Sequence, residues 1–177
     1  MIFRKIVALF FAMIRKNNLA AKVLGVHFLE GCKFIGNPIS IFGSEPWAIT
    51  IGSHVEITNG VQIITHDGAL WTLRDRPDYQ NADIIKKVII GNNVFIGVNC
   101  VILAGVTIGN NVIIGAGTIV NKDIPDNSVA VGCPVKVVKS IEDYESKVSE
   151  IGFLNTKQMS RKKKKEIWEK EFGDGID

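Results

Sequence analysis

Hydrophobic positions recur every six residues along the middle of the chain. From Ile90 the sequence divides into the hexapeptides IGNNVF, IGVNCV, ILAGVT, IGNNVI, IGAGTI and VNKDIP, and IGSHVE, ITNGVQ and IITHDG from Ile51 show the same pattern. The first position of each unit is Ile or Val, and the fifth is apolar or small apart from Asp67. This period matches neither an α-helix nor a coiled coil, so the pattern indicates a repeat architecture built from short strands.

The fourth position of the repeat suits a sharp corner. In the first five units from Ile90 it is Asn or Gly, residue types that tolerate left-handed backbone: Asn93, Asn99, Gly105, Asn111 and Gly117. Each hexapeptide is then one flat strand plus one turn, and three hexapeptides make one coil of eighteen residues. Coils stacked about 4.8 Å apart would bury the two apolar columns. The repeat therefore predicts an all-β core, a parallel β-helix over residues 24–140.

The repeat is interrupted in two places. Ile63 and Ile90 lie 27 residues apart, which is not a multiple of six, and residues 68–87 carry no repeat but several charged residues and a proline. We expect residues 68–87 to form an excursion loop that begins where Asp67 stands in a normally apolar position. Upstream the pattern is irregular: residues 28–34 suit the start of the first coil, whereas residues 42–48 break the frame.

Both ends of the chain are predicted to be helical. Residues 1–23 suit an N-terminal amphipathic helix, in which an apolar stripe of Phe3, Ile6, Val7, Phe10, Met13 and Ile14 lies opposite Arg4, Lys5, Ala8, Ala12, Arg15 and Lys16. The favoured interpretation is that this stripe caps one end of the core, and the alternative is a basic helix lying on a membrane surface. Residues 141–177 predict a C-terminal helical extension, in which residues 161–165 form a basic, solvated face.

Composition and charge exclude several classes of protein. The 177 residues are 46% hydrophobic and 8% aromatic, which suits one domain with an aliphatic core. A net charge of +3 gives none of the concentrated positive field that a nucleic-acid binder uses. Three cysteines without CxxC spacing argue against a disulfide framework or a zinc site and favour a reducing cytoplasm. The apolar run of residues 6–14 is too short to span a bilayer and lacks a convincing cleavage site for secretion.

The tandem hexapeptides, the THDG of residues 65–68 and the stretch IGAGTIVNKDIPDNSVAVGCPVKVVKS of residues 114–140 resemble the hexapeptide acyltransferases. Within that superfamily the chain is similar to short bacterial enzymes that acetylate sugars, including polysaccharide O-acetyltransferases and the galactoside and maltose acetyltransferases. The resemblance implies a left-handed coil, acetyl-CoA as co-substrate, no required metal, and a homotrimer with active sites between prisms. It also implies O-acetylation of a sugar or of a polysaccharide or lipopolysaccharide precursor.

Three histidines, His27, His54 and His66, are the candidates for a catalytic imidazole. His66 holds the corner position of the last repeat before the excursion, so its side chain should point outward at the root of the loop, and the family's catalytic histidine matches this position. Because an imidazole can accept a hydroxyl proton near neutral pH, we expect His66 to act as general base in a direct transfer. His54 is expected to be a polar corner residue, and His27 is given no chemical role.

Support for His66 is expected from residues near the loop. Asp67 either orients His66 or binds the acceptor, or else it caps its own backbone turn. Glu45 lies near the place where some relatives carry an asparagine that holds the acetyl or acceptor group. Trp71 and Tyr79 offer flat faces that either wall a sugar pocket or anchor the loop on a neighbouring prism, and the pocket role is favoured for Trp71.

The resemblance also implies a groove for the co-substrate between coils. It puts the backbone N–H of Val98 at the oxyanion, where relatives carry a serine. It further implies Ala116, Asn121 and Lys122 along the pantetheine arm and Lys136 and Lys139 at the CoA phosphates.

Three other functions fit the same fold. One is an N-acetyltransferase for an amino-sugar nucleotide, or an acetyltransferase for a xenobiotic. Another is a zinc hydro-lyase like the γ-type carbonic anhydrases, although His54 and His66 would lie on different faces. The third is a non-catalytic prism that mediates assembly. We expect a cytoplasmic protein. If the N-terminal helix binds a membrane, the protein would lie at the inner face of that membrane.

Overall fold

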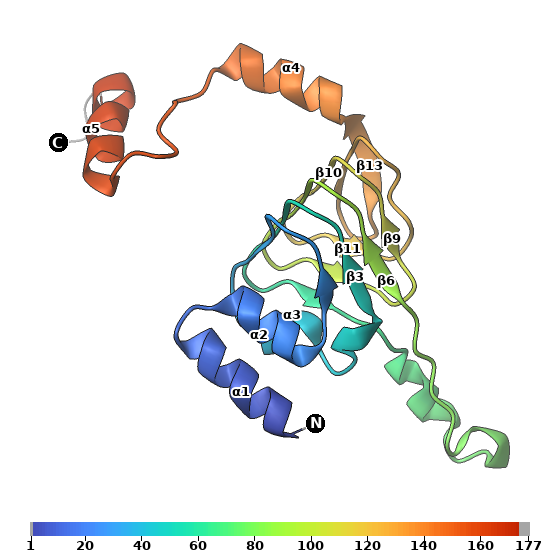
Figure 1. Cartoon of the computed structure of the whole chain (residues 1–177). Helices are drawn as coiled ribbons and strands as arrows, with labels where there is room; N and C mark the ends of the chain where they lie inside the picture. The colour runs from blue at the N-terminus through green and yellow to red at the C-terminus, as the bar shows by residue number, and fades with distance from the viewer. Residues whose placement is uncertain (1, 174–177) are drawn as a thin grey trace. The chain divides into compact units, whose positions relative to one another are not determined.

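The structure is a computed structural model that describes residues 2–173, and the chain divides into two compact units, residues 1–144 and 145–177. The outermost residues of the two predicted terminal regions, 1 and 174–177, lie outside the described residues. In the first unit the chain winds through three sheets in turn (Figure 1). Strands β3, β4 and β5 each enter a different sheet, and β6, β7 and β8 repeat the cycle.

The strands are short and, with one exception, parallel. One sheet contains β1 (His27–Phe28), β3 (Ile49–Ile51), β6 (Val88–Ile90) and β9 (Thr107–Ile108). The second contains β2 (Lys33–Phe34), β4 (Val55–Ile57), β7 (Val94–Ile96), β10 (Val112–Ile114), β12 (Ser128–Val131) and the antiparallel β13 (Lys136–Ser140). The third contains β5 (Gln62–Ile63), β8 (Val101–Ile102) and β11 (Ile119–Val120).

The pairing register confirms stacked coils of eighteen residues. Ile90 pairs with Ile108 and Ile96 with Ile114, in each case 18 positions further along the chain. The side chains of the first and fifth repeat positions are at most 4% exposed, apart from Asp67. Each such aliphatic side chain contributes about 1.5–3 kcal/mol when fully buried, so the two columns are the main source of stability.

The corners also form as predicted. Asn93, Asn99 and Asn111 have φ between 54° and 58°, and Gly105 and Gly117 also have positive φ. His54, with φ 55°, starts a ladder along one corner: its Nδ1 lies 2.8 Å from Asn93 Oδ1, and Asn93 donates to Asn111 at 3.0 Å. His54 is therefore a structural corner residue, as expected.

The N-terminal region contains two helices where one was predicted: α1 (Ile2–Met13) and α2 (Asn17–Leu24). The chain turns between them at Arg15, which has φ 58°. The amides of Asn17 and Asn18 then donate to the carbonyls of Phe34 and Cys32, both at 2.7 Å. These bonds tie the start of α2 to the first coil, so a continuous helix over residues 1–23 does not form.

The prediction that the apolar stripe of the first helix caps the core is wrong. Phe3, Ile6, Phe10 and Met13 are exposed, whereas Ala8 on the opposite face is fully buried. Helix α1 packs on α2 and on α3 (Pro38–Phe42). Side-chain size explains the orientation, because Ala8 and the buried alanines of α2 let the helices approach closely.

Two insertions separate the regular coils. Ile51 pairs with Ile90, 39 residues away, so the excursion adds 39 − 18 = 21 residues to one coil. It contains two 3-10 helices, η2 (Gly68–Leu73) and η3 (Pro77–Tyr79). Phe28 pairs with Ile51 and Phe34 with Ile57, which confirms that residues 28–34 begin the first coil. The break at residues 42–48 contains the end of α3 and the 3-10 helix η1 (Pro46–Ala48).

The C-terminal residues form two helices, α4 (Ile141–Ile151), which begins in the first unit, and α5 (Arg161–Phe172). Neither of these two described helices buries a side chain. Ser160 caps α5 by accepting a hydrogen bond from the backbone N–H of Lys163. Within residues 2–173, no helix has the length and apolar character needed to cross a bilayer.

We expect the corner ladder to contribute measurably to stability. Asn111→Ala should lower the free energy of unfolding by about 1–3 kcal/mol, because it forces alanine into left-handed backbone and removes two ladder bonds. Asn111→Gly restores only the preference for left-handed backbone, so its free energy of unfolding should fall by about 1 kcal/mol less than that of Asn111→Ala. Urea unfolding measures both variants, and equal losses would show that the backbone preference contributes nothing.

Candidate functional site

The candidate site lies where the excursion leaves the coils. His66 follows β5, and its backbone forms an antiparallel bridge with Ile85 at the other end of the excursion. On either side of it, Lys86 N donates to Thr65 O at 2.7 Å and Asp67 N donates to Ile84 O at 3.0 Å. These bonds close the root of the loop, and they hold the His66 backbone while leaving its side chain 45% exposed.

A carboxylate holds the imidazole of His66. Glu45 Oε2 lies 2.8 Å from His66 Nδ1, and the same oxygen accepts a hydrogen bond of 2.7 Å from the hydroxyl of Thr65. Thr65 is buried, and the Glu45 side chain is 19% exposed. Glu45 is thus fixed from two directions by consecutive residues of the chain, and it orients His66.

This contact sets the tautomer of His66. An ionised carboxylate has no proton to donate, so Nδ1 must carry the hydrogen in the 2.8 Å bond. In the neutral imidazole the other nitrogen, Nε2, then has a free lone pair. The pair therefore presents a base at the exposed edge of the ring.

The charge on Glu45 is stabilised by its neighbours. Burial raises the pKa of Glu45, but hydrogen bonds from Thr65 and His66, the positive charge that His66 can carry and a hydrogen bond from Ser44 outweigh burial. The pKa of Glu45 therefore lies below its ordinary value, and the group is a carboxylate near neutral pH.

The break in the hexapeptide frame is what brings Glu45 to His66. Asn37 caps α3 by accepting from Ile39 N, and Pro38 occupies its first turn. After Gly43 turns the chain with φ 60°, Glu45 precedes the 3-10 helix η1, which Pro46 starts. Thr65 and Ser44, which hold Glu45, were not singled out from the sequence. The signal was the position of FGSEPWA, which interrupts the hexapeptide frame.

One hollow includes His66, and a second is lined by the residues on either side of Glu45 but by neither member of the pair. The first, of about 320 Å³, lies beside His66 and is lined by Ile64, His66, Asp67, Ile84, Lys86, Leu103 and Ala104. The other, of about 260 Å³, lies at the residues that flank Glu45 and is lined by Arg4, Lys5, Leu24, Gly43, Ser44, Pro46 and Trp47. Trp47 is exposed and gives the second hollow a flat aromatic wall that sequence reasoning missed.

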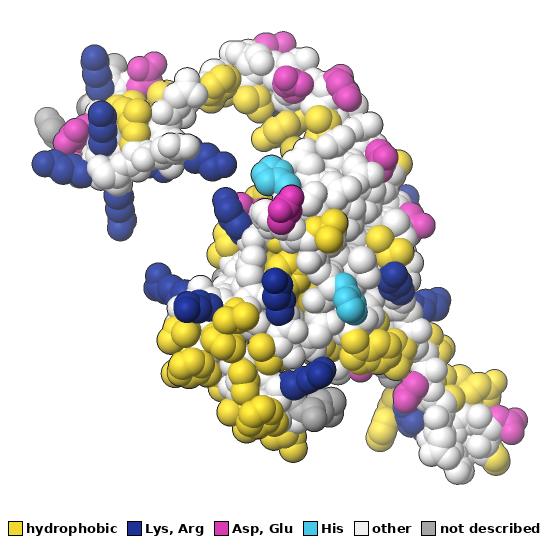
Figure 2. Space-filling model, viewed as in Figure 1, with side chains coloured by type: hydrophobic (Ala, Val, Ile, Leu, Met, Phe, Trp, Pro, Cys, Tyr) yellow, Lys and Arg dark blue, Asp and Glu magenta, His cyan; other side chains and the backbone are white. Residues whose placement is uncertain are grey.

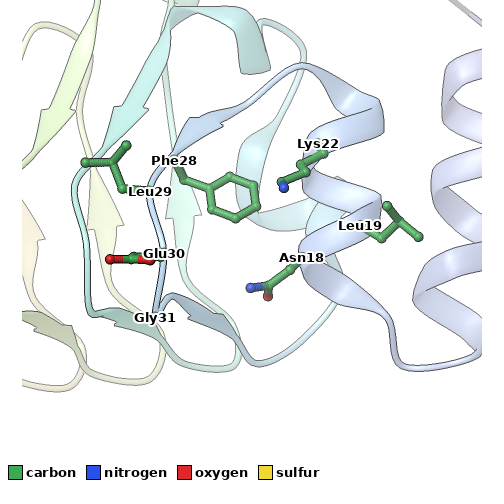
Figure 3. Close-up of a pocket in the computed structure, with 7 residues that line it drawn as sticks. All are labelled: Asn18, Leu19, Lys22, Phe28, Leu29, Glu30 and Gly31. Carbon is green, nitrogen blue, oxygen red and sulfur yellow. The ribbon is translucent and has the colours of Figure 1, made fainter.

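A further hollow, of about 350 Å³, lies between α2 and the first coil (Figure 3). Phe28 points from β1 toward α2, and Lys22 Nζ lies 5.6 Å from the centre of its ring. Asn18, Leu19 and Glu30 also line it. None of the residues predicted for the site lies in this lining, so we do not assign it to the same chemistry.

Two loop residues were predicted to support the site. Asp67 Oδ1 accepts from Ala69 N at 3.0 Å, so Asp67 caps its own turn, which is one of the expected alternatives, and it also lines the hollow beside His66. The orienting role belongs to Glu45. Trp71 is 76% exposed and is absent from the lining of the hollow beside His66, so within one chain it does not wall that hollow.

The residues predicted to bind the co-substrate fall at separate places. Asn121 and Lys122 follow β11, at the same edge of the third sheet as His66, which follows β5. Val98 and Ala116 follow β7 and β10, at the opposite edge. From Ala116 to Asn121 the extended chain covers roughly 16 Å. Lys136, which is exposed, and Lys139, which is half-buried, lie on β13. One chain therefore does not bring Val98 and Ala116 to His66.

Among the described residues, no three His, Cys, Asp or Glu side chains form a cluster that could hold a metal ion. His54 lies in the asparagine ladder, and His66 pairs with Glu45. The three cysteines are free thiols, two buried and Cys133 exposed.

Comparison with known proteins agrees with this architecture. Residues 87–122 match the family model described as bacterial transferase hexapeptide (six repeats). Protein CapG from Staphylococcus aureus is 49% identical over 144 residues, covering 80% of this chain and 83% of CapG. Galactoside O-acetyltransferase from Escherichia coli is 43% identical over 102 residues, covering 57% of this chain and 48% of that enzyme. The chain thus spans about half the length of the galactoside enzyme.

A solved structure shares the fold. The hexapeptide-repeat-containing acetyltransferase VCA0836 from Vibrio cholerae, in complex with acetyl coenzyme A, superposes with a TM-score of 0.51 at 24% identity, covering 71% of this chain and 76% of the other.

Because the pKa of Glu45 is lowered, its carboxylate contributes stability above its ordinary pKa of 4.5, and that contribution is lost as the pH falls through the folded-state value. Wild type should therefore be more stable than Glu45→Gln at pH 7, and the gap should shrink as the pH falls below about 4. Thermal unfolding of both proteins from pH 7 down to about pH 3 measures the gap. A gap that stayed constant or widened as the pH fell below about 4 would contradict the assigned role of Glu45.

Proposed function

The chain belongs to the hexapeptide-repeat acetyltransferases, and we propose that it transfers an acetyl group from acetyl-CoA to a sugar hydroxyl with His66 as general base. The observation that carries this proposal is the 2.8 Å contact between Glu45 Oε2 and His66 Nδ1, which leaves Nε2 as an exposed base. Membership of the family supports a left-handed coil. The oxygen acceptor and the sugar are inferred from the match to galactoside O-acetyltransferase.

The chemistry follows from this tautomer. Nε2 of His66 takes the proton of the acceptor hydroxyl as its oxygen attacks the thioester carbonyl of acetyl-CoA, forming a C–O bond and a tetrahedral oxyanion. When the C–S bond breaks, the imidazolium returns the proton to the sulfur. Glu45 stabilises the imidazolium between these steps, as the carboxylate of other histidine-based acyl-transfer sites does. Val98 N–H is our candidate donor to the oxyanion.

We further propose that the site is completed by a neighbouring copy in a homotrimer. The separation of His66 from Val98 and Ala116 by the width of the third sheet supports this arrangement. In a trimer, the groove of one chain at Ala116 would face His66 of the next, with Lys136 and Lys139 at the CoA phosphates. Asn121 and Lys122 would border the same groove from the His66 side.

For the acceptor we propose the hollow at Glu45. Trp47 provides a face on which a sugar ring can stack, and the hydroxyl of Ser44 links this hollow to the Glu45 carboxylate. Within a single chain, Trp47 is therefore our candidate for the aromatic face of the sugar site, in place of Trp71. A sugar or polysaccharide precursor is the acceptor class that fits best. Three cysteines without CxxC spacing support our proposal of a reducing, cytoplasmic setting.

Loss of the base should abolish transfer without unfolding the protein. His66→Ala should lower kcat by at least about 10²-fold, because it removes the imidazole that accepts the hydroxyl proton. Glu45→Gln should lower kcat by about tenfold, because the imidazole of His66 loses its fixed orientation. The KM for acetyl-CoA should change little, because the binding site for acetyl-CoA is not altered. CoA release with a panel of galactosides, maltose, amino-sugar nucleotides and chloramphenicol measures both effects and separates O-acetylation from N-acetylation.

His54→Ala is the matched control, since His54 is also an exposed corner histidine bonded to a neighbouring side chain. It should keep its turnover. Full activity of His66→Ala with every acceptor would refute the proposed base.

A mixing experiment tests the shared site. His66→Ala lacks the base, and Ala116→Trp should block the groove for the pantetheine arm, so each variant alone should be inactive. If each site takes His66 from one chain and Ala116 from the next, co-expressed mixed trimers should regain roughly a quarter of wild-type activity. Light scattering checks the trimer mass, and a mixture without any regained activity would show that one chain supplies both residues.

A further inference from the structure

The outer face of α1 is an exposed apolar surface. Phe3 is 77% exposed, Met13 75%, Ile6 61% and Phe10 58%. Figure 2 shows hydrophobic side chains gathered over the N-terminal helices, with Lys and Arg side chains at the margin. Because the helix already buries Ala8 against the rest of the unit, these four side chains are surplus to folding. An apolar surface of this kind usually meets a partner.

The charged residues of α1 and of the segments next to it in the sequence all have one sign. Arg4 and Lys5 lie in the first turn of α1, and Arg15 and Lys16 follow its last turn. The sequence contains no Asp or Glu before Glu30. The face is therefore bracketed at both ends by positive charge, which complements an anionic surface.

These charges disfavour a second copy of the same face. A twofold contact between two α1 helices would bring Arg4 and Lys5 of one chain against Arg15 and Lys16 of the other, or each pair against itself. Either arrangement places like charges together without an acidic residue to compensate. A helix of 12 residues is about 18 Å long, too short to cross a hydrocarbon core of about 30 Å, so it must lie along a surface.

We propose that α1 docks this protein on an anionic lipid membrane. The helix lies in the plane of the interface, with Phe3, Phe10 and Met13 inserted among the acyl chains and the four basic residues at the lipid phosphates. Arg4 and Lys5 also line the hollow proposed for the acceptor, so the test below leaves both unchanged. The side chains that it does change neither belong to the pair of Glu45 and His66 nor line the two hollows near the pair, so membrane contact and acetyl transfer can be measured separately.

Vesicle co-sedimentation of the full chain tests the proposal. Wild type should bind vesicles of phosphatidylglycerol and phosphatidylcholine, bind pure phosphatidylcholine much less, and dissociate as salt is raised. Phe3→Ser with Phe10→Ser should weaken binding by at least about tenfold. Arg15→Gln with Lys16→Gln should weaken it about tenfold on anionic vesicles. Since all four side chains are exposed, the thermal midpoints should not change.

Phe153→Ser with Phe172→Ser is the matched control, because these phenylalanines are 67% and 59% exposed in the C-terminal unit, near the basic run of α5. It should bind as wild type does. Loss of binding in this control would assign the membrane contact to the C-terminal unit and overturn the proposal. So would absence of wild-type binding, undiminished binding of the α1 variant, or a drop in oligomeric mass of that variant, which would identify the face as an interface between copies.

Discussion

Everything in the first unit depends on the vertical stacking of isoleucine and valine side chains inside an eighteen-residue coil. The strands are only two to five residues long and have little stability alone. Alignment of the columns is what holds them, since Ile90, Ile108 and their equivalents meet the same kind of neighbour in every coil. A shift of one residue would turn each column outward, so the register is strongly fixed.

The two segments that interrupt the regular coils bring together the residues of the candidate site. The break before β3 carries Glu45, and the excursion after β5 begins at Asp67, next to His66. They meet because coils stack directly, so residues 20 apart in sequence can hydrogen-bond across one step of the stack, as Thr65 and Glu45 do. The rigid columns hold both segments in place, which is how a small scaffold can fix an imidazole to one tautomer.

The sequence was most informative where one residue type repeats. The columns, the corners at Asn93 and Asn111, and the role of His54 could all be predicted, because each depends on local backbone preference and a fixed period. Glu45 could be named only as a neighbour of the site, since its contact with His66 depends on the path of α3 and η1. The orientation of α1 was missed because a hydrophobic stripe says nothing about which face offers the smaller side chains. Ala8 decided that question through close packing.

The 21-residue excursion has an evolutionary implication. In a stack where every layer touches just the layers above and below it, a segment can be lengthened, shortened or exchanged at one corner without disturbing the layers further away. Arg74 and Asp83 join the arms of the excursion to each other, which makes it a self-contained module. The excursion can therefore change in length and sequence while Glu45 and His66 at its base are inherited unchanged.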